Sequence, residues 1–177
     1  MKNIKKGCFI LLLISIFGCQ NQEKNNSKSK NQEKELLKKE FVVTINFKSN
    51  KSDTFDLYLY NIIKDEYQSK YIVISEKTIP TSEMENITAN FGENISRNFR
   101  INFGNNEVKD IQIKSIEISF GPNKIFIDPE DLTQYFNFNE YIFQDSDTYV
   151  LHTQQIDGKH NPIIYLKSEY LGELQKE

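Results

Sequence analysis

The chain has few histidines and cysteines, two residue types that many enzymes use for catalysis or for holding a metal. Its 177 residues include no tryptophan, two histidines and two cysteines, Cys8 and Cys19. No disulfide can therefore form beyond residue 19, and stability must come from a hydrophobic core. Glycine-rich phosphate loops, the Gly-x-Ser-x-Gly motif and the HExxH motif are also absent. We therefore expect no cofactor and no enzymatic activity.

Clusters of positive charge are missing as well. From residue 41 onward, 13 lysines and arginines face 21 aspartates and glutamates, a net charge of −8. Proteins bind the phosphates of nucleic acids through groups of lysine and arginine. The charge balance therefore argues against a nucleic acid as a partner.

A targeting signal is present at the N-terminus. Lys2, Lys5 and Lys6 precede an apolar run from Cys8 to Phe17. A basic start followed by about 7–15 apolar residues is typical of a secretory signal peptide, and a membrane-spanning helix needs about 20 residues. We therefore expect residues 1–18 to be removed during export.

The end of this segment, Ile16-Phe17-Gly18-Cys19, resembles the lipobox of bacterial lipoproteins, although Phe17 is bulkier than the residue usual there. The resemblance implies cleavage before Cys19 and attachment of acyl chains, including palmitate, to its sulfur. Two or three acyl chains anchor a protein stably to a membrane. Gln20 follows the cysteine in place of the aspartate that retains enterobacterial lipoproteins in the inner membrane. We therefore expect a lipid-anchored protein of the bacterial cell envelope, in the outer membrane.

The composition changes sharply near residue 40. Residues 20–40 are mainly Asn, Gln, Glu, Lys and Ser, with no aromatic and no β-branched side chain. Such a segment buries too little apolar surface to fold. We expect the lipidated cysteine and a flexible tether over 19–40, and one domain over 41–177.

Alternating apolar residues predict strands in this domain. Alternate residues of 41–47 and 55–59 are apolar, which places them on one face of each strand. Further strands are expected at 67–75, 87–91, 99–103, 111–120, 125–127, 141–143, 149–154 and 162–166. Within 111–120 the alternation slips by one residue after Ile113, which predicts a β-bulge.

One short helix is expected near 128–136. Asp128 can act as its cap, Pro129 suits the first helical position, and Leu132, Tyr135 and Phe136 have helical spacing. The fold class is therefore all-β, an antiparallel β-sandwich that is jelly-roll-like, with about eight strands and this helix.

The order of motifs from residue 55 onward resembles a β-sandwich domain common in lipoproteins and polysaccharide-related proteins of the Bacteroidetes. The motifs are 55–60, 99–104, 111–116, 128–136 and 139–142. The family often has Leu-Arg-Ile-Asp-Pro-Gly at the second motif, where this chain has Asn102 and Phe103 before the glycine. The resemblance implies a carbohydrate-binding-like jelly roll and carries no catalytic residues.

Three residues are candidates for ligand binding. Tyr58 and Tyr60 alternate with the expected core residues of their strand, and Arg100 alternates with those of another. Sugars stack on aromatic rings, and a guanidinium stacks on a ring or binds a carboxylate. Two structural alternatives stay open: the tyrosines face a second sheet, or Arg100 forms a cross-strand ion pair.

Metal sites have weaker support. Zinc needs three or four ligands, and the only histidines are His152 and His160. Asp145 and Asp147 are weak candidates for calcium, since the segment lacks a glycine bend and a suitably spaced glutamate. We expect no metal.

The sequence therefore predicts a non-enzymatic envelope protein that binds a ligand or glycan, or acts as a scaffold. A protein-interaction accessory or immunity-type lipoprotein is the alternative. An enzyme acting on envelope glycans is a weaker alternative, because paired carboxylates can occur by chance among 21 acidic residues.

Overall fold

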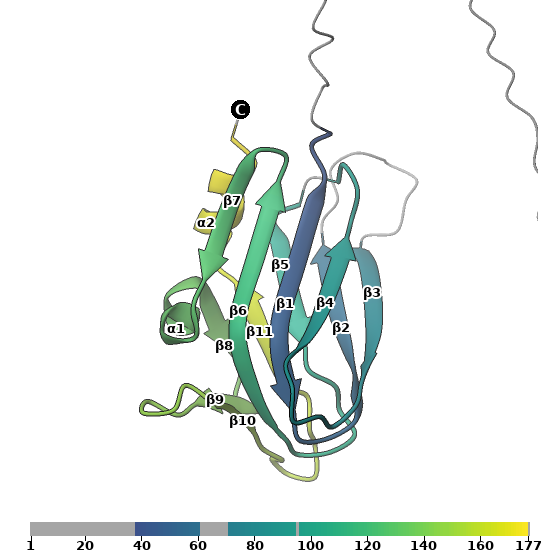
Figure 1. Cartoon of the computed structure of the whole chain (residues 1–177), viewed down its shortest axis with the longest axis vertical. Coiled ribbons are helices and arrows are strands. Elements are labelled where there is room, and N and C mark those ends of the chain that lie inside the picture. The colour runs from purple at the N-terminus through teal and green to yellow at the C-terminus, as the bar shows by residue number, and fades with distance from the viewer. Residues whose placement is uncertain (1–37, 61–70, 95, 177) are drawn as a thin grey trace, which may run out of the picture. The chain divides into compact units, whose positions relative to one another are not determined.

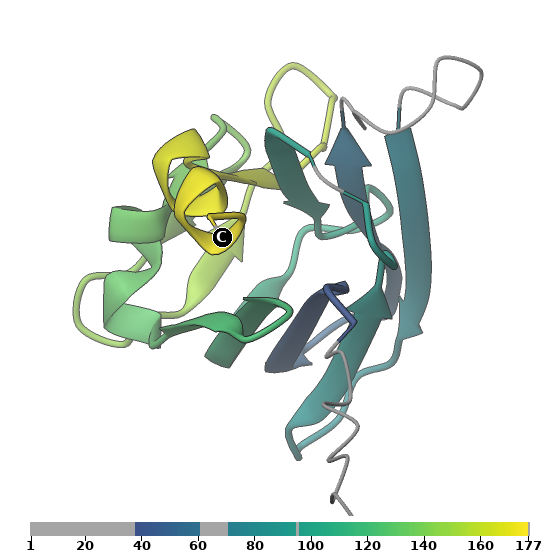
Figure 2. The same cartoon turned by 90° about the horizontal axis from the view of Figure 1, so that it is seen from above.

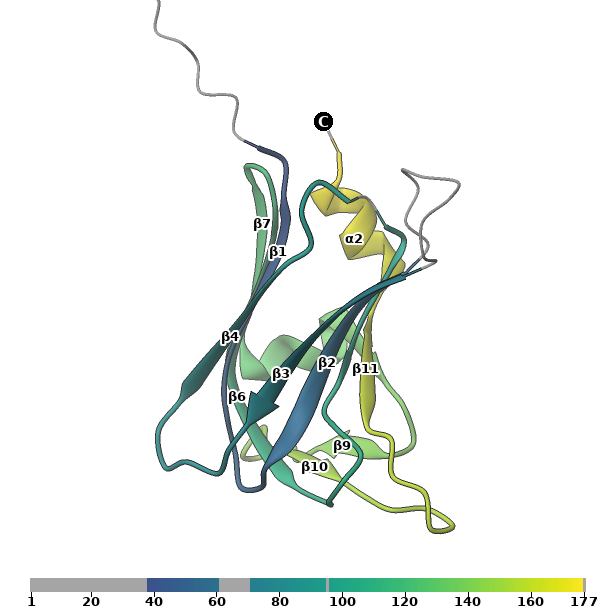
Figure 3. The same cartoon turned by 90° about the vertical axis from the view of Figure 1, so that its right-hand side faces the viewer.

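The structure is a computed structural model that describes residues 38–60, 71–94 and 96–176. These residues form two antiparallel sheets packed face to face, which confirms the predicted all-β sandwich (Figures 1 and 3). The predicted signal peptide, Cys19 and all but the end of the predicted tether lie outside the described residues. Within the described part, no helix has the length and apolar character needed to cross a bilayer.

Sheet A has the strand order β4-β1-β6-β10-β9, and β7 also pairs with β6. Its strands are β1 (Phe41–Ser49), β4 (Glu85–Asn90), β6 (Asp110–Phe120), β7 (Asn123–Ile127), β9 (Ile142–Gln144) and β10 (Leu151–Thr153).

Sheet B has the order β3-β2-β5-β11-β8, so β3 lies at one edge. Its strands are β2 (Asp53–Tyr60), β3 (Tyr71–Thr78), β5 (Asn98–Asn102), β8 (Phe136–Phe138) and β11 (Ile163–Leu166). The expected third strand thus ends at Thr78 instead of Ser75, and residues 67–70 lie outside the described part. There are 11 described strands rather than about eight; the ranges expected above correspond to ten of them, and the other is β8, a segment of three residues.

Alternation along β1 and β2 decides which side chains form the core. The apolar residues predicted to point inward are completely buried: Phe41, Val43, Ile45, Phe47, Phe55, Leu57 and Leu59. Burying a side chain of this size contributes about 1.5–3 kcal/mol. The intervening residues of both strands point away from the core and are partly exposed.

The predicted β-bulge is present in β6. Asn46 of β1 pairs with Ser115, whereas the next residue, Phe47, pairs with Ile113, so Lys114 is left over. The extra residue lets both Ile113 and Ile116 point into the core, as their burial shows.

The expected helix is a 3-10 turn, η1 (Pro129–Asp131), followed by α1 (Leu132–Tyr135). Pro129 occupies its first position, but Asp128 makes no side-chain capping hydrogen bond, so that part of the prediction is wrong. A second helix, α2 (Ser168–Leu174), was not expected from the sequence. It contacts β5 and β7, one strand of each sheet, and covers one end of the sandwich (Figure 2).

Candidate functional site

A continuous row of large side chains crosses the outer face of sheet B. Tyr58 of β2 lies opposite Val73 of β3 on one side and Arg100 of β5 on the other. Arg100 in turn lies opposite Tyr165 of β11. The pairing of four strands therefore brings together residues more than 100 positions apart. We call Tyr58, Tyr60, Tyr71, Val73, Arg100 and Tyr165 the aromatic row.

The guanidinium of Arg100 lies against two tyrosine rings at once. Its Cζ atom is 4.5 Å from the ring centroids of both Tyr58 and Tyr60. The two rings stack with centroids 5.6 Å apart and an interplanar angle of 21°. Tyr71 extends the cluster, with its centroid 5.4 Å from that of Tyr60. Such cation–π contacts hold a guanidinium in a fixed orientation.

Hydrogen bonds to Asp56 hold Tyr58, within the aromatic row, and Ser75 in place. The Tyr58 hydroxyl donates to the carboxylate of Asp56 over 3.3 Å, and the Ser75 hydroxyl donates to the same carboxylate over 2.5 Å. Burial raises the pKa of the Tyr58 hydroxyl, and the Asp56 carboxylate raises it further, while Arg100 opposes the shift. Tyr58 is therefore a neutral hydrogen-bond donor at physiological pH.

A shallow cavity of about 210 Å³ opens beside the arginine. Its lining includes Tyr60, Asn98, Arg100 and Tyr165. The Nε atom of Arg100 is buried and has no hydrogen-bond partner in the described part of the chain, and Tyr165 and Tyr71 are 38% and 46% exposed. Aromatic surface, the Asn98 amide and the Arg100 guanidinium therefore lie within one small area beside the cavity.

The predicted candidates Tyr58, Tyr60 and Arg100 are thus brought together, and they lie on the outside of the sandwich. The alternative in which the two tyrosines face the second sheet is wrong, because Leu57 and Leu59 take that side. The alternative of a cross-strand ion pair is not observed either: among the described residues, Arg100 contacts aromatic rings and forms no ion pair. Whether the cluster binds a ligand stays a prediction.

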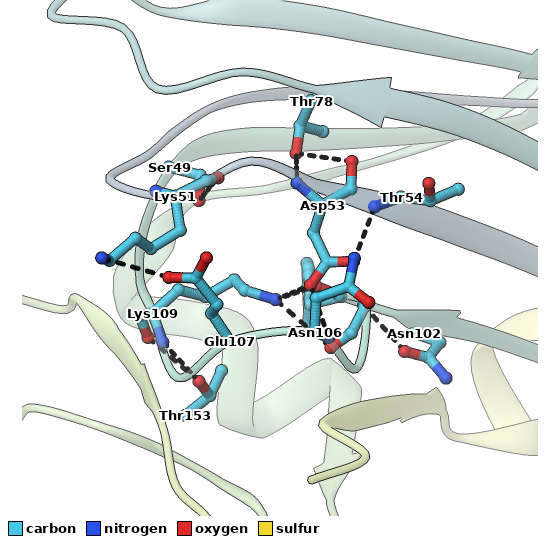
Figure 4. A network of polar contacts seen from close by, with 12 residues as sticks. Ser49, Lys51, Asp53, Thr54, Thr78, Asn102, Asn106, Glu107, Lys109 and Thr153 are labelled. Atoms are coloured by element: carbon cyan, nitrogen blue, oxygen red, sulfur yellow. Dashed lines mark hydrogen bonds and ion pairs between the residues drawn. The ribbon is translucent and has the colours of Figure 1, made fainter.

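Sequence reasoning missed a second polar site, which lies between the two sheets. Asp53 at the start of β2 and Lys109 just before β6 form an ion pair, with side chains 3% and 0% exposed (Figure 4). The Lys109 ammonium also donates to the carbonyl oxygens of Phe103 and Gly104, at 3.0 and 3.3 Å.

Three further donors surround the Asp53 carboxylate. Oδ1 accepts from the Thr54 backbone N–H at 2.8 Å and from the Asn106 side-chain amide at 3.0 Å, and Oδ2 accepts from the Asn106 backbone N–H at 3.0 Å. Burial acts to raise the pKa of Asp53, but these hydrogen bonds and Lys109 outweigh it and lower the pKa overall. Burial lowers the pKa of Lys109 in spite of its partner.

The two histidines lie in separate places. His152 bonds to the Asp110 carboxylate through Nδ1 at 2.7 Å, beside a cavity of about 310 Å³ at one end of sheet A. His160 lies in the loop before β11, near Asp53 and Lys109, and its burial lowers its pKa. No group of three or more His, Cys, Asp and Glu residues suited to a metal occurs in the described part of the chain.

The weak calcium candidates lie in the turn between β9 and β10. Asp145 Oδ1 accepts hydrogen bonds from the Asp147 N–H and from the N–H and hydroxyl of Thr148. These bonds to Thr148 and Asp147 lower the pKa of Asp145. The carboxylate therefore stabilises its own turn.

No family model, curated protein or solved structure matches this chain. The resemblance to the Bacteroidetes sandwich domain stays a prediction.

Proposed function

We propose that this protein is a non-enzymatic, lipid-anchored protein of the bacterial cell envelope that binds a glycan on the outer face of sheet B. The proposal rests on two features, the lipobox-like sequence that ends at Cys19 and the aromatic row. The observation that carries it is the position of Arg100, held 4.5 Å from two tyrosine rings beside an open cavity.

The chemistry of the row suits a sugar. A pyranose ring has apolar C–H faces that pack on aromatic rings, and hydroxyl groups at its rim that need hydrogen-bond partners. Tyr165 and Tyr71 supply exposed ring surface, and Arg100 and Asn98 supply donors beside it. Because the tyrosines orient the guanidinium before a ligand arrives, little side-chain entropy is lost on binding.

A glycan array tests the proposal directly. The complete chain, purified in detergent, should bind a restricted set of glycans. Tyr165→Ala and Arg100→Lys should each weaken that binding at least about tenfold, which corresponds to about 1.4 kcal/mol. Lysine keeps the charge of Arg100 but loses its planar stacking and its multiple donors.

Phe126 provides the matched control. It is 59% exposed and lies on β7 of sheet A, on an outer face with no aromatic row. Phe126→Ala should leave glycan binding unchanged. An array without hits, or equal losses in Phe126→Ala and Tyr165→Ala, would contradict the proposal.

The edge strand β3 favours a second candidate function, binding of a protein partner. In the described part of the chain β3 pairs only with β2, and Tyr71, Val73 and nearby Ile79 are 46%, 42% and 63% exposed. An unpaired edge with apolar side chains accepts an additional strand. This is the role of an accessory or immunity-type lipoprotein.

Proline distinguishes the two candidates. Lys77→Pro places a proline in β3 outside the aromatic row and should abolish recovery of a stoichiometric partner from solubilised membranes, with glycan binding retained. If membranes yield no stoichiometric partner, this second function is excluded.

A further inference from the structure

We propose that Lys109 and Asp53 condense into an intramolecular amide bond that links the two sheets. The bond would join Lys109 Nζ to Asp53 Cγ and release one water. Asp53 opens β2 in sheet B, and Lys109 directly precedes β6 in sheet A. No cysteine exists in this domain, so this is a cross-link that the chain can form without a disulfide.

The arrangement brings the reacting atoms together. Nζ is in close contact with Oδ2, which is bonded directly to Cγ, so the nitrogen is one covalent bond beyond contact with the carbon that it would attack. The backbone of Gly104 covers the carboxyl group: a Cβ atom there would lie 2.1 Å from Asp53 Cγ. With both side chains almost fully buried, bulk water is kept from the site (Figure 4).

The hydrogen bonds of the ammonium define the first step. Its acceptors are Asp53 Oδ2 and the carbonyl oxygens of Phe103 and Gly104. Transfer of the proton on the first of these bonds gives a neutral amine and a carboxylic acid. The two carbonyls then hold the remaining N–H groups and leave the nitrogen lone pair directed at the carboxyl group.

The remaining steps balance without a co-reactant. The lone pair attacks Cγ, and Oδ1 becomes an oxyanion that accepts from the Thr54 N–H and the Asn106 amide at 2.8 and 3.0 Å. Donors placed in this way stabilise tetrahedral intermediates. A second proton passes from Nζ to Oδ2, which leaves as water while the Oδ1 double bond re-forms. The ammonium and carboxylate have then become one amide and one water.

The buried environment favours the product. Two buried charges carry a large desolvation cost, which their mutual attraction only partly offsets. An amide carries no charge, and its oxygen keeps the donors that now serve Oδ1. Burial lowers the pKa of Lys109, which favours the amine, whereas the hydrogen bonds to Asp53 lower the pKa of its carboxyl group and oppose transfer of the proton to it.

Mass spectrometry of a tryptic digest of the complete, denatured protein tests this inference. With the bond in place, trypsin cannot cleave after Lys109, so the peptide 101–114 remains intact and joined to the peptide 52–64. The joined mass is the sum of both peptides minus one water. Recovery of separate peptides 52–64 and 101–109 as the main products would overturn the proposal.

The same digest contains a matched control. Lys124 and Glu117 form an ion pair of 2.6 Å, but their side chains are 64% and 38% exposed. Trypsin should cleave normally after Lys124. If this exposed pair is joined as often as the buried one, the cross-link does not arise from the buried site.

Asn106→Ala separates chemistry from folding. It removes one donor from Oδ1 and leaves Lys109 and Asp53 in place. In a pulse-chase experiment, the joined peptide should form at least about tenfold more slowly than in the parent, as expected when an oxyanion donor is lost. Equal rates in folded protein would contradict the assigned role of Asn106.

Discussion

The outer faces of the two sheets have the same position in the sandwich but different chemistry. On sheet A, polar outward side chains pair across strands: Thr44 contacts Thr88, the Asn46 amide donates to Asn86, and Lys124 pairs with Glu117, although Asn46 Oδ1 has no hydrogen-bond partner among the described residues. On sheet B, the equivalent positions hold the aromatic row.

This difference indicates which outer face serves the fold alone and which one we expect to bind a ligand. Short polar pairs across strands need no further partner and suit contact with water. An arginine stacked on two tyrosines beside a cavity, with Tyr71 and Tyr165 exposed next to it, presents aromatic surface to another molecule. Folding alone does not require such a face, so sheet B is where we place ligand binding.

The largest expected effect is on membrane attachment, and it leaves the outer faces of both sheets unchanged. Cys19→Ser removes the sulfur that we propose carries the acyl chains, so the protein should move almost completely from the membrane to the soluble fraction. Fractionation followed by immunoblotting measures this change. Glycan binding per molecule should stay the same, and a variant that still sediments with membranes would refute lipid anchoring through Cys19.

The next-largest effect is on stability, and it does not distinguish the two outer faces. It comes from disturbing Asp53, which pairs with Lys109 between the sheets. Gly104→Ala places a methyl group 2.1 Å from Asp53 Cγ at a residue with φ +83°, and should lower the free energy of unfolding by about 2–4 kcal/mol.

Gly158→Ala is the control for Gly104→Ala. Its φ is +73°, but no atom lies within 4 Å of the added methyl group, so only about 1 kcal/mol should be lost. Urea denaturation measures both variants, and similar losses would show that the contact with Asp53 is unimportant.

Substitution of one residue on each face compares their packing. Tyr58→Ala loses ring stacking and the cation–π contact and should cost about 1–2 kcal/mol. Thr44→Ala loses a single cross-strand contact, for which we expect below about 1 kcal/mol. Tyr58→Phe should retain most of the stability, since the ring remains, and equal losses in the two alanine variants would remove the contrast between the faces.

Sheet B should respond to alkaline pH through Tyr58. The pKa of Tyr58 is raised in the folded protein, so the unfolded chain loses this proton first as pH rises above about 10. The contribution of Tyr58 to stability is therefore complete below that pH and declines above it. Ultraviolet titration should detect one late-ionising tyrosine, absent in Tyr58→Phe; no difference between the two titrations would contradict the raised pKa.

Local patterns predicted both faces. Alternation identified the inward residues of β1 and β2 and put Tyr58 and Tyr60 on the opposite face of their strand, but the structure was needed to show that, in the described part of the chain, no second sheet covers that face. The slip near Ile113 predicted the bulge, because a bulge changes the sequence pattern directly. Arg100 could be placed on an outer face, but strand order was needed to place it beside Tyr58.

Long-range pairing could not be predicted in this way. Asp53 and Lys109 are 56 residues apart, and Asp53 directly follows the polar segment 49–52, which is typical of a turn. Nothing local marks a lysine that is fully buried, since lysine is almost always exposed. Helix α2 had a usable signal, the buried Leu171 and Leu174 at helical spacing, but too few turns to stand out.

The most direct test of the central claim is a backbone amide NMR titration of the complete chain in detergent with a glycan selected on the array. We predict saturable shift changes concentrated on β2, β3, β5 and β11, centred on Arg100, with little change on β1, β4, β6 and β7. Changes centred on the outer face of sheet A, or no saturable changes at all, would contradict the account.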